Sequence, residues 1–234
     1  MYQLYIGNKN YSSWSLRPWV LLSALEIPFD EQLIPFDDGN SWEKFRAFSP
    51  TGLVPCLVDG DTTVWESLAI TEYVAERTAG VWPEDPVARA WARSATAEMH
   101  AGFSALRNDC PMTVGLRVKM HTQSDALHRD LARLNELWAE GLERFGGPYL
   151  AGPDFTAVDA FFAPVAFRAQ TYALPLAETS QAYLDRLLAL PAMQAWTDAA
   201  LAEPWREPSH EEEIAAIGEW LADHRVQGRE GGTP

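Results

Sequence analysis

A cluster of polar side chains lies in Asn10-Tyr-Ser-Ser-Trp-Ser-Leu-Arg-Pro-Trp19, at the junction between a predicted strand and a predicted helix. Three serines, an asparagine and an arginine within ten residues are groups that can hydrogen-bond a ligand. In open α/β sheets, ligands bind beyond the carboxyl ends of the strands, which is where this stretch falls. The alternative is that the serines only cap the helix, because serine is a preferred N-cap residue.

Two further pairs of residues could take part in binding. Val54-Pro55 opens the first strand of a predicted hairpin, and Glu66-Ser67 starts the helix after that hairpin. Proline at this point fits the start of a strand or a sheet edge. On residue types alone, Glu66-Ser67 indicates only a helix start.

The cysteines and histidines predict neither a disulfide framework nor a metal site. Cys56 and Cys110 are far apart in the sequence, and nothing near Cys56 would lower the pKa of its thiol. Cys110 ends a predicted helix, where a packing role is expected. The histidines show no metal-ligand spacing with cysteines or acidic residues, so no metal is predicted.

Composition limits the classes of function. The chain has 234 residues, of which 47% are hydrophobic, so it can bury a substantial core. Acidic residues outnumber basic ones by 33 to 18, and the resulting charge of −15 argues against nucleic acid or an anionic membrane as a partner. We find no signal peptide and no apolar run of about eighteen residues that could span a membrane, so we expect a cytoplasmic protein.

Residues 1–80 are predicted to form a compact α/β unit. Alternating or helical spacing of apolar residues gives the order strand, helix, strand, short helix, strand, strand, helix. These elements are expected at 2–7, 15–26, 29–36, 42–48, 53–65 (the two strands of a hairpin) and 67–77, with Pro18 in the first turn of its helix. The stretch 79–86, Ala-Gly-Val-Trp-Pro-Glu-Asp-Pro, contains a glycine and two prolines, and residues 81–86 are predicted to be a linker.

The pattern beyond the linker is helical throughout, so residues 87–225 are predicted to form an all-α domain. Helices are expected at 87–109, 123–145, from 156 onward, and near 179–190, 191–203 and 210–225, the last with Ser209 as a possible cap. Thr156 and Asp159 have the spacing of a capping box. Residues 226–234 are predicted to be a disordered tail.

Together these motifs resemble the cytosolic glutathione transferases, most closely the serine-type classes such as zeta. The resemblance runs to about residue 225 and depends on four segments in order: Tyr11-Ser-Ser-Trp-Ser-Leu-Arg17, Ser49-Pro-Thr-Gly-Leu-Val-Pro55, Glu66-Ser-Leu-Ala-Ile70 and Thr156-Ala-Val-Asp159. It implies a thioredoxin-like N-terminal domain with a mixed four-stranded sheet, followed by an all-α domain.

The resemblance also implies how glutathione would bind. The Ser12 hydroxyl, with Ser13 beside it, would hydrogen-bond the glutathione sulfur as a thiolate, the form of the thiol that reacts. The step at Val54 and Pro55 would contain a cis-proline and present backbone groups to the cysteinyl part. Glu66 and Ser67 would bind the γ-glutamyl end, with the helix N-terminus favouring its carboxylate.

One departure from the family concerns the glycyl carboxylate. Members of the family often have Lys or Gln directly before the Val-Pro step, whereas this chain has Leu53. Trp42 and Lys44 are the alternative candidates for that contact, and Trp14 is expected to touch ligand. Arg17 is expected to tie the two domains together instead.

The second-substrate pocket would be shaped by the first long helix. Met99, Phe103 and Arg107 form one stripe on that helix, with His100 beside it. A core face is the simpler interpretation for most of this stripe. In the fold that the resemblance implies, however, His100 and Arg107 are candidate polar groups facing an electrophile.

The expected activity is conjugation of glutathione to a small apolar electrophile. A maleylacetoacetate-type cis–trans isomerase is a weaker alternative, because Trp14 stands where that class has a cysteine after the paired serines. Leu53 keeps a second alternative open, a non-catalytic glutathione- or ligand-binding module. A homodimer is expected from the family, and the aromatic side chain of Trp82 is a suggested contact.

Overall fold

The computed structural model describes residues 1–36 and 41–226, so residues 227–234 of the predicted tail lie outside the described residues. The first part of the chain forms a four-stranded mixed sheet with strand order β2-β1-β3-β4. Strand β1 (Tyr2–Ile6) runs parallel to β2 (Phe29–Leu33) and antiparallel to β3 (Cys56–Asp59), which pairs antiparallel with β4 (Thr62–Trp65). The predicted α/β architecture is therefore confirmed.

Three helices belong to this unit, α1 (Ser13–Ala24), α2 (Ser41–Arg46) and α3 (Ser67–Ala75). Helix α1 begins two residues earlier than predicted, because Ser12 provides the N-cap and its side chain accepts a hydrogen bond from Ser15 N. Pro18 consequently lies beyond the first turn, inside the helix, and not in the first turn as expected.

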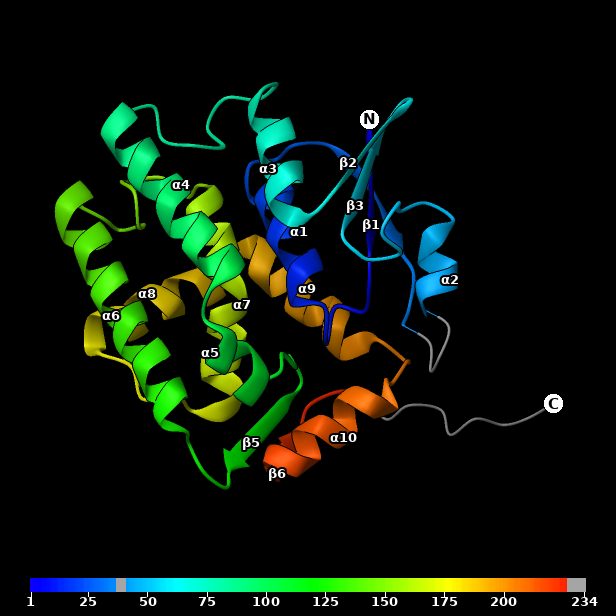
Figure 1. The fold of residues 1–234 in the computed structure, drawn as a ribbon, viewed down its shortest axis with the longest axis vertical. Helices are drawn as coiled ribbons and strands as arrows, with labels where there is room; N and C mark the ends of the chain where they lie inside the picture. Colours follow the sequence, from blue (N-terminus) through cyan, green and yellow to red (C-terminus); the bar gives the residue numbers. More distant parts are fainter. Residues whose placement is uncertain (37–40, 227–234) are drawn as a thin grey trace.

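The second part of the chain is mainly helical and lies beside the sheet unit in Figure 1. Its helices are α4 (Pro86–Ala101), α5 (Ser104–Asp109), α6 (Asp125–Phe145), α7 (Ala157–Tyr172), α8 (Glu178–Leu188), α9 (Pro191–Ala202) and α10 (Pro208–Ile217). Helix α7 is buried along nearly its whole length and packs against both α1 and α4. The capping box expected at Thr156 and Asp159 is present at its start.

The single helix predicted over residues 87–109 is wrong. Helix α4 ends at Ala101, and Phe103 adopts a left-handed backbone conformation with φ of 52° before α5 begins at Ser104. Gly102, the C-cap residue of α4, stands directly before Phe103, and glycine disfavours the interior of a continuous helix. As a result, Met99 and Arg107 lie on two separate helices.

The helix predicted over residues 210–225 is also wrong in its second half. Helix α10 ends at Ile217, and β6 (Gly218–Asp223) pairs antiparallel with β5 (Leu116–Met120). The helix is capped by Glu207, whose side chain accepts from His210 N, and not by Ser209. The second part is therefore helical with one two-stranded ribbon, shown at the bottom of Figure 1.

The segment between α3 and α4 is tied to the helical part. Val81 is fully buried and accepts a hydrogen bond from Ala157 N at the start of α7. Trp82 is only 7% exposed, which corrects the suggestion that it is an exposed aromatic contact for a second subunit. The division of the chain into domains at 81–86 stays a prediction.

Candidate functional site

The loop that carries the serines is held by contacts from two other segments, the end of α9 and Gly115. The Glu203 carboxylate, at the end of α9, accepts hydrogen bonds from Lys9 N at 2.6 Å and Asn10 N at 3.2 Å. The Asn10 side chain donates to Ala200 O and accepts from Gly115 N. These buried contacts fix the backbone that enters α1, so the start of this helix has a defined position.

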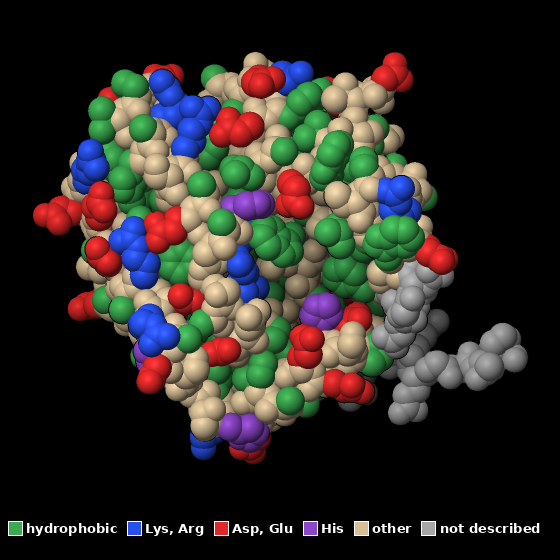
Figure 2. Space-filling model, in the orientation of Figure 1, with side chains coloured by type: hydrophobic (Ala, Val, Ile, Leu, Met, Phe, Trp, Pro, Cys, Tyr) green, Lys and Arg blue, Asp and Glu red, His purple; other side chains and the backbone are tan. Residues whose placement is uncertain are grey.

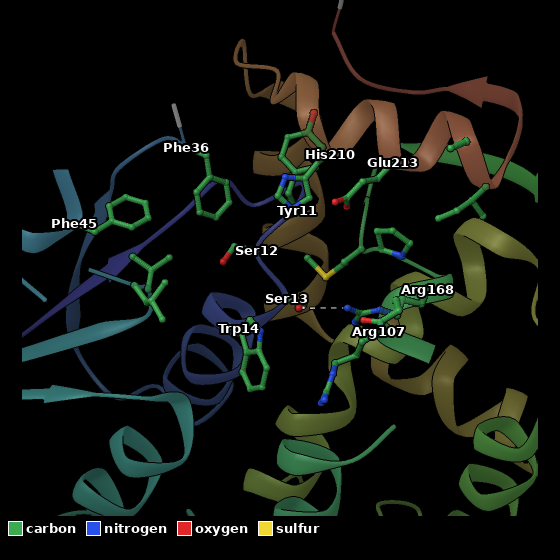
Figure 3. A pocket seen from close by; sticks show the side chains of 17 residues that line it. Tyr11, Ser12, Ser13, Trp14, Phe36, Phe45, Arg107, Arg168, His210 and Glu213 are labelled. Carbon is green, nitrogen blue, oxygen red and sulfur yellow. Dashed lines mark hydrogen bonds between the residues drawn. The ribbon is translucent and has the colours of Figure 1, made fainter. Parts of the chain in front are cut away.

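A cavity of about 810 Å³ opens above the start of α1, between the sheet unit and the helical part. Tyr11, Ser12, Ser13 and Trp14 form its floor, as Figure 3 shows. The other lining residues come from both parts of the chain: Phe36, Phe45, Leu53, Val54, Arg107, Asn108, Pro111, Met112, Arg168, His210, Glu213, Ala216 and Ile217. We call this space the serine cavity. Figure 2 shows hydrophobic, basic and histidine side chains around the centre of the face that it draws.

The two serines differ in their hydrogen bonds. The Ser12 hydroxyl donates to Ser15 Oγ at 2.7 Å, and Ser15 Oγ also accepts from Gly7 N. The Ser13 Oγ accepts a hydrogen bond from Arg168 Nη2 at 3.4 Å, drawn as the dashed line in Figure 3. The hydrogen of Ser12 is thus directed into the loop, whereas Ser13 is polarised by a cation.

A smaller cavity of about 340 Å³ adjoins this region and is lined by Trp14, Thr51, Leu53, Val54, Pro55 and Glu66. Trp14, Leu53 and Val54 line both cavities, so together the cavities extend from Ser12 to Glu66. The Val54–Pro55 peptide bond is cis, which confirms the expectation at this step.

The far end of the smaller cavity is formed by the start of α3. Glu66 has a positive φ of 71°, which is uncommon for a residue with a side chain, and its carboxylate is 51% exposed. Ser67 is fully buried, and its Oγ has no hydrogen-bond partner among the described residues. His100 Nε2 lies 4.0 Å from Glu66 Oε2, so the start of α3 faces α4.

Several predicted residues lie outside the two cavities. Met99 and Phe103 are buried in the core and line neither of them. His100 packs edge-on against Trp14 at 5.2 Å between ring centroids, and burial lowers the pKa of its imidazole. Trp42 and Lys44 lie on α2, and neither lines a cavity. Of the predicted second-substrate residues, Arg107 alone lines the serine cavity.

The cysteines and Tyr11 are poor nucleophiles or acids in this fold. Both cysteines are buried and free, and burial raises the pKa of Cys56 to about 11 and that of Cys110 to about 12. The Tyr11 hydroxyl donates to Glu211 at 2.7 Å and accepts from Arg225, and burial followed by the Glu211 contact raises its pKa. The hydroxyls of Ser12 and Ser13 therefore remain the candidates for contact with a reacting group.

Sequence reasoning missed the wall of the serine cavity that comes from α7 and α10. Arg168 is a single arginine in an apolar helix, and His210 belongs to a segment with no recognisable motif. His210 stacks on Tyr11 and Phe36 at centroid distances of 5.3 and 5.9 Å, and its Nδ1 lies 2.6 Å from Glu207 Oε2. Nothing in the local pattern predicts these contacts.

The described residues offer neither a cluster of metal ligands nor a helix that could span a membrane. Within residues 1–36 and 41–226, no three His, Cys, Asp or Glu side chains are grouped so that they could hold a metal ion. None of the helices in the same ranges has the length and apolar character needed to cross a bilayer.

Comparison with known proteins gives two matching family models. The model for the glutathione S-transferase N-terminal domain matches residues 11–77, and the model for the C-terminal domain matches residues 89–199. Maleylacetoacetate isomerase from Rattus norvegicus is 26% identical over 90% of this chain and 96% of its own length. Dichloromethane dehalogenase from Methylorubrum extorquens is 45% identical, but the match spans only 25% of this chain and 22% of that protein.

Solved structures share the fold. A glutathione transferase homologue from Burkholderia GL BGR1 with bound glutathione aligns with a TM-score of 0.65 at 23% identity, covering 85% of this chain and 97% of its own. A theta class glutathione S-transferase from Xanthomonas axonopodis pv. citri, also with glutathione bound, aligns with a TM-score of 0.63 at 24% identity, covering 84% and 96%.

Proposed function

Since the chain belongs to the glutathione S-transferase family, a family of enzymes, we propose that it activates glutathione in the serine cavity and transfers it to an electrophile there. The main support for this proposal is that Ser12, the cis Val54–Pro55 step and Glu66 lie along two adjoining cavities. Glutathione would lie with its γ-glutamyl end at Glu66 and Ser67 and its sulfur near the start of α1.

The sulfur would be held as a thiolate by the groups at the start of α1. A thiolate is stabilised by hydroxyl donors and by the positive end of a helix dipole, and both occur at Ser12 and Ser13. For Ser12 to donate to sulfur, its hydroxyl must turn away from Ser15 Oγ, its present acceptor. The unpartnered Ser67 hydroxyl would donate to the glutathione α-carboxylate, and the exposed Glu66 carboxylate would take the ammonium group.

Kinetics of serine variants test this proposal. We expect Ser12→Ala to lower kcat/KM for 1-chloro-2,4-dinitrobenzene by roughly 100-fold, the usual size for loss of one donor to a developing anion. Ser13→Ala is expected to act in the same direction. Ser94→Ala is the control, because Ser94 bonds only to Ala90 O on the exposed side of α4.

An unchanged rate in the Ser12→Ala/Ser13→Ala double variant would overturn the role of the serines. Calorimetry with glutathione separates binding from turnover. Binding without turnover on a panel of electrophiles would favour a binding module instead of an enzyme.

A glutathione-dependent cis–trans isomerisation is the second candidate. The similarity to rat maleylacetoacetate isomerase along nearly the whole of that protein favours it. In such a reaction the thiolate adds to a double bond and leaves again, so no glutathione is consumed. Product analysis distinguishes the two, because conjugation consumes glutathione in proportion to product.

We also propose a cytoplasmic homodimer, as the family suggests. Large apolar side chains on the sheet unit are exposed, including Trp42 at 60% and Trp65 at 42%, and they could form part of a contact between subunits. Sedimentation giving only a monomer would remove this part of the proposal.

A further inference from the structure

Two arginines line the helical wall of the serine cavity, Arg107 on α5 and Arg168 on α7. Arg168 is only 4% exposed; its Nε donates to Cys110 O at 2.8 Å and its Nη2 to Ser13 Oγ. Its Nη1 is buried and has no hydrogen-bond partner within the part of the chain that the structure describes. Arg168 lines the serine cavity, so a rotation of its guanidinium would bring this spare donor to an acceptor there.

A third guanidinium lies directly behind the cavity floor. Arg17 is 1% exposed, and its Cζ lies 4.1 Å from the centroid of the Trp14 ring. Arg107 Cζ lies 5.6 Å from the same ring. The Nε and Nη1 of Arg17 have no hydrogen-bond partner among the described residues. Burial, and then the charges of Arg168 and Arg107, lower the pKa of Arg17, so the three cations repel one another.

None of the ion pairs among the described residues includes Arg17, Arg107 or Arg168. Glu213 also lines the serine cavity, from α10, but none of the described ion pairs joins it to an arginine. Glu66 and Asp130 act on Arg17 and Arg107 only as nearby charges. Burying a cation without a counter-ion costs free energy. The chain as a whole carries a net charge of −15. A local excess of positive charge in such an acidic protein indicates an anionic ligand.

We propose that the electrophile carries a carboxylate, and that Arg168 and Arg107 bind it on the helical wall of the serine cavity. This inference rests on the proposed glutathione-dependent function and names the class of its second substrate. It modifies the small apolar electrophile expected from the sequence, for which Arg107 is already a candidate polar contact. The planar guanidinium suits a carboxylate because it can donate two parallel hydrogen bonds.

The position of the arginines also fits the reaction. Arg168 contacts Ser13, which lies beside Ser12 at the start of α1 where the sulfur is proposed to lie. A carboxylate bound to Arg168 would therefore keep the rest of its molecule within the serine cavity. Phe36, Phe45 and Met112 provide apolar surface for that remaining part.

A matched pair of probes tests the proposal. In 4-chloro-3-nitrobenzoate and 4-chloro-3-nitrobenzamide, the glutathione sulfur forms a bond to the ring carbon that bears chlorine. Chloride leaves with the bonding electrons, and the thiol proton passes to solvent. Each kcat/KM is divided by the uncatalysed rate constant for the same probe. We expect the wild type to prefer the benzoate by about 30-fold, the size of one or two charge-assisted hydrogen bonds.

Variants then assign the preference to residues. Arg168→Met is expected to reduce the benzoate-to-benzamide ratio to near 1, and Arg168→Lys to retain part of it. Arg107→Met is expected to reduce the ratio by a smaller factor, and it serves as the test if Arg168→Met does not fold. The control is Arg133→Met, because Arg133 pairs with Glu98 on α4 and lines neither cavity, so the ratio should not change.

A carboxylate of glutathione is the other possible source of the anion. In that case Arg168→Met would raise the KM for glutathione and slow both probes equally, which would overturn the proposal. A wild-type ratio near 1 would overturn it as well. Absence of glutathione binding in calorimetry would instead reject the proposed function itself, so the two failures are distinguishable.

Discussion

Helix α7 buries an acid near its start and a base in its C-terminal half, and the surrounding structure satisfies them differently. The Asp159 carboxylate accepts hydrogen bonds from Thr156 N at 3.0 Å, Leu150 N at 3.1 Å and the Tyr183 hydroxyl at 2.9 Å. Arg168 makes two contacts, with Cys110 O and Ser13 Oγ, and one of its buried nitrogens has no partner among the described residues. Asp159 is enclosed, whereas Arg168 lines a cavity.

This difference in hydrogen bonding distinguishes a charged residue that stabilises the fold from one that binds a ligand. Buried polar groups in proteins are nearly always hydrogen-bonded, so a complete set of internal partners indicates a structural role. Asp159 joins the start of α7 to the preceding loop and to α8. The incomplete set at Arg168, at a cavity wall, indicates a role in binding.

The largest effect should come from removing the enclosed charge. Asp159→Ala leaves two backbone N–H groups and the Tyr183 hydroxyl without an acceptor, and it removes the capping box. We expect a loss of about 4 kcal/mol in the free energy of unfolding, measured by chemical denaturation. Asp185→Ala is the control on the exposed face of α8 and should change stability by less than about 0.5 kcal/mol. A loss below about 1 kcal/mol would contradict the structural role of Asp159.

A change of pH is expected to have a smaller effect on the free energy of unfolding. Burial raises the pKa of Asp159 from 3.8 to about 6, against the opposing hydrogen bonds from Thr156 and Leu150. The folded state therefore binds this proton more tightly than the unfolded state. The stabilising contribution of protonation is complete below pH 3.8 and is lost as the pH rises through about 6.

The direction of this pH dependence can be measured by comparison with a variant that does not titrate at position 159. Between pH 5 and pH 7.5, wild-type stability should fall relative to that of Asp159→Asn by about 1.4 kcal/mol. Using the difference between the two proteins removes the contribution of the other carboxylates. A difference that stays constant, or that grows with pH, would show that the hydrogen bonds outweigh burial at Asp159.

The smallest effect on stability should come from Arg168. Arg168→Met replaces an incompletely bonded buried cation with an apolar side chain of similar length. We therefore expect stability to change by less than about 1 kcal/mol in either direction, although the substrate preference is lost. The same denaturation measurement, made without glutathione, checks this expectation. A loss of more than about 3 kcal/mol would mean that Arg168 also holds the fold together.

The fold of the sheet unit could be predicted because its signals are local. Alternating apolar residues, the turn at Asp59-Gly-Asp61 and the helix starts all act within a few residues, and they give the observed order of elements. The ribbon of β5 and β6 could not be predicted in this way. Leu116 and Asp223 pair across more than a hundred residues of sequence, and each strand is short.

The residues of the candidate site differ in the same way, because only some of them have a local signal in the sequence. Ser12, Val54, Pro55 and Glu66 could be singled out because each belongs to a short motif, and the two cavities bring them together. Arg168 could not, because its importance depends on burial and on an unpartnered nitrogen, which only three-dimensional packing determines. Met99 and Phe103 are buried in the core, as the core-face interpretation expects, but the stripe does not continue to Arg107 on one helix because the backbone turns at Phe103.

The contacts between the first loop and the last segment bear on when the site forms during synthesis. Tyr11 and Glu211 are 200 residues apart in sequence, Tyr11 and Arg225 are 214 apart, and Lys9 meets Glu203 across 194. A ribosome adds roughly 5–20 residues per second, so the serine loop is made many seconds before these partners exist. The sheet around it can pair early, but the contacts that hold the serine loop can be completed only after residues 203–225 have been synthesised. The site therefore forms after the sheet unit that carries the serines.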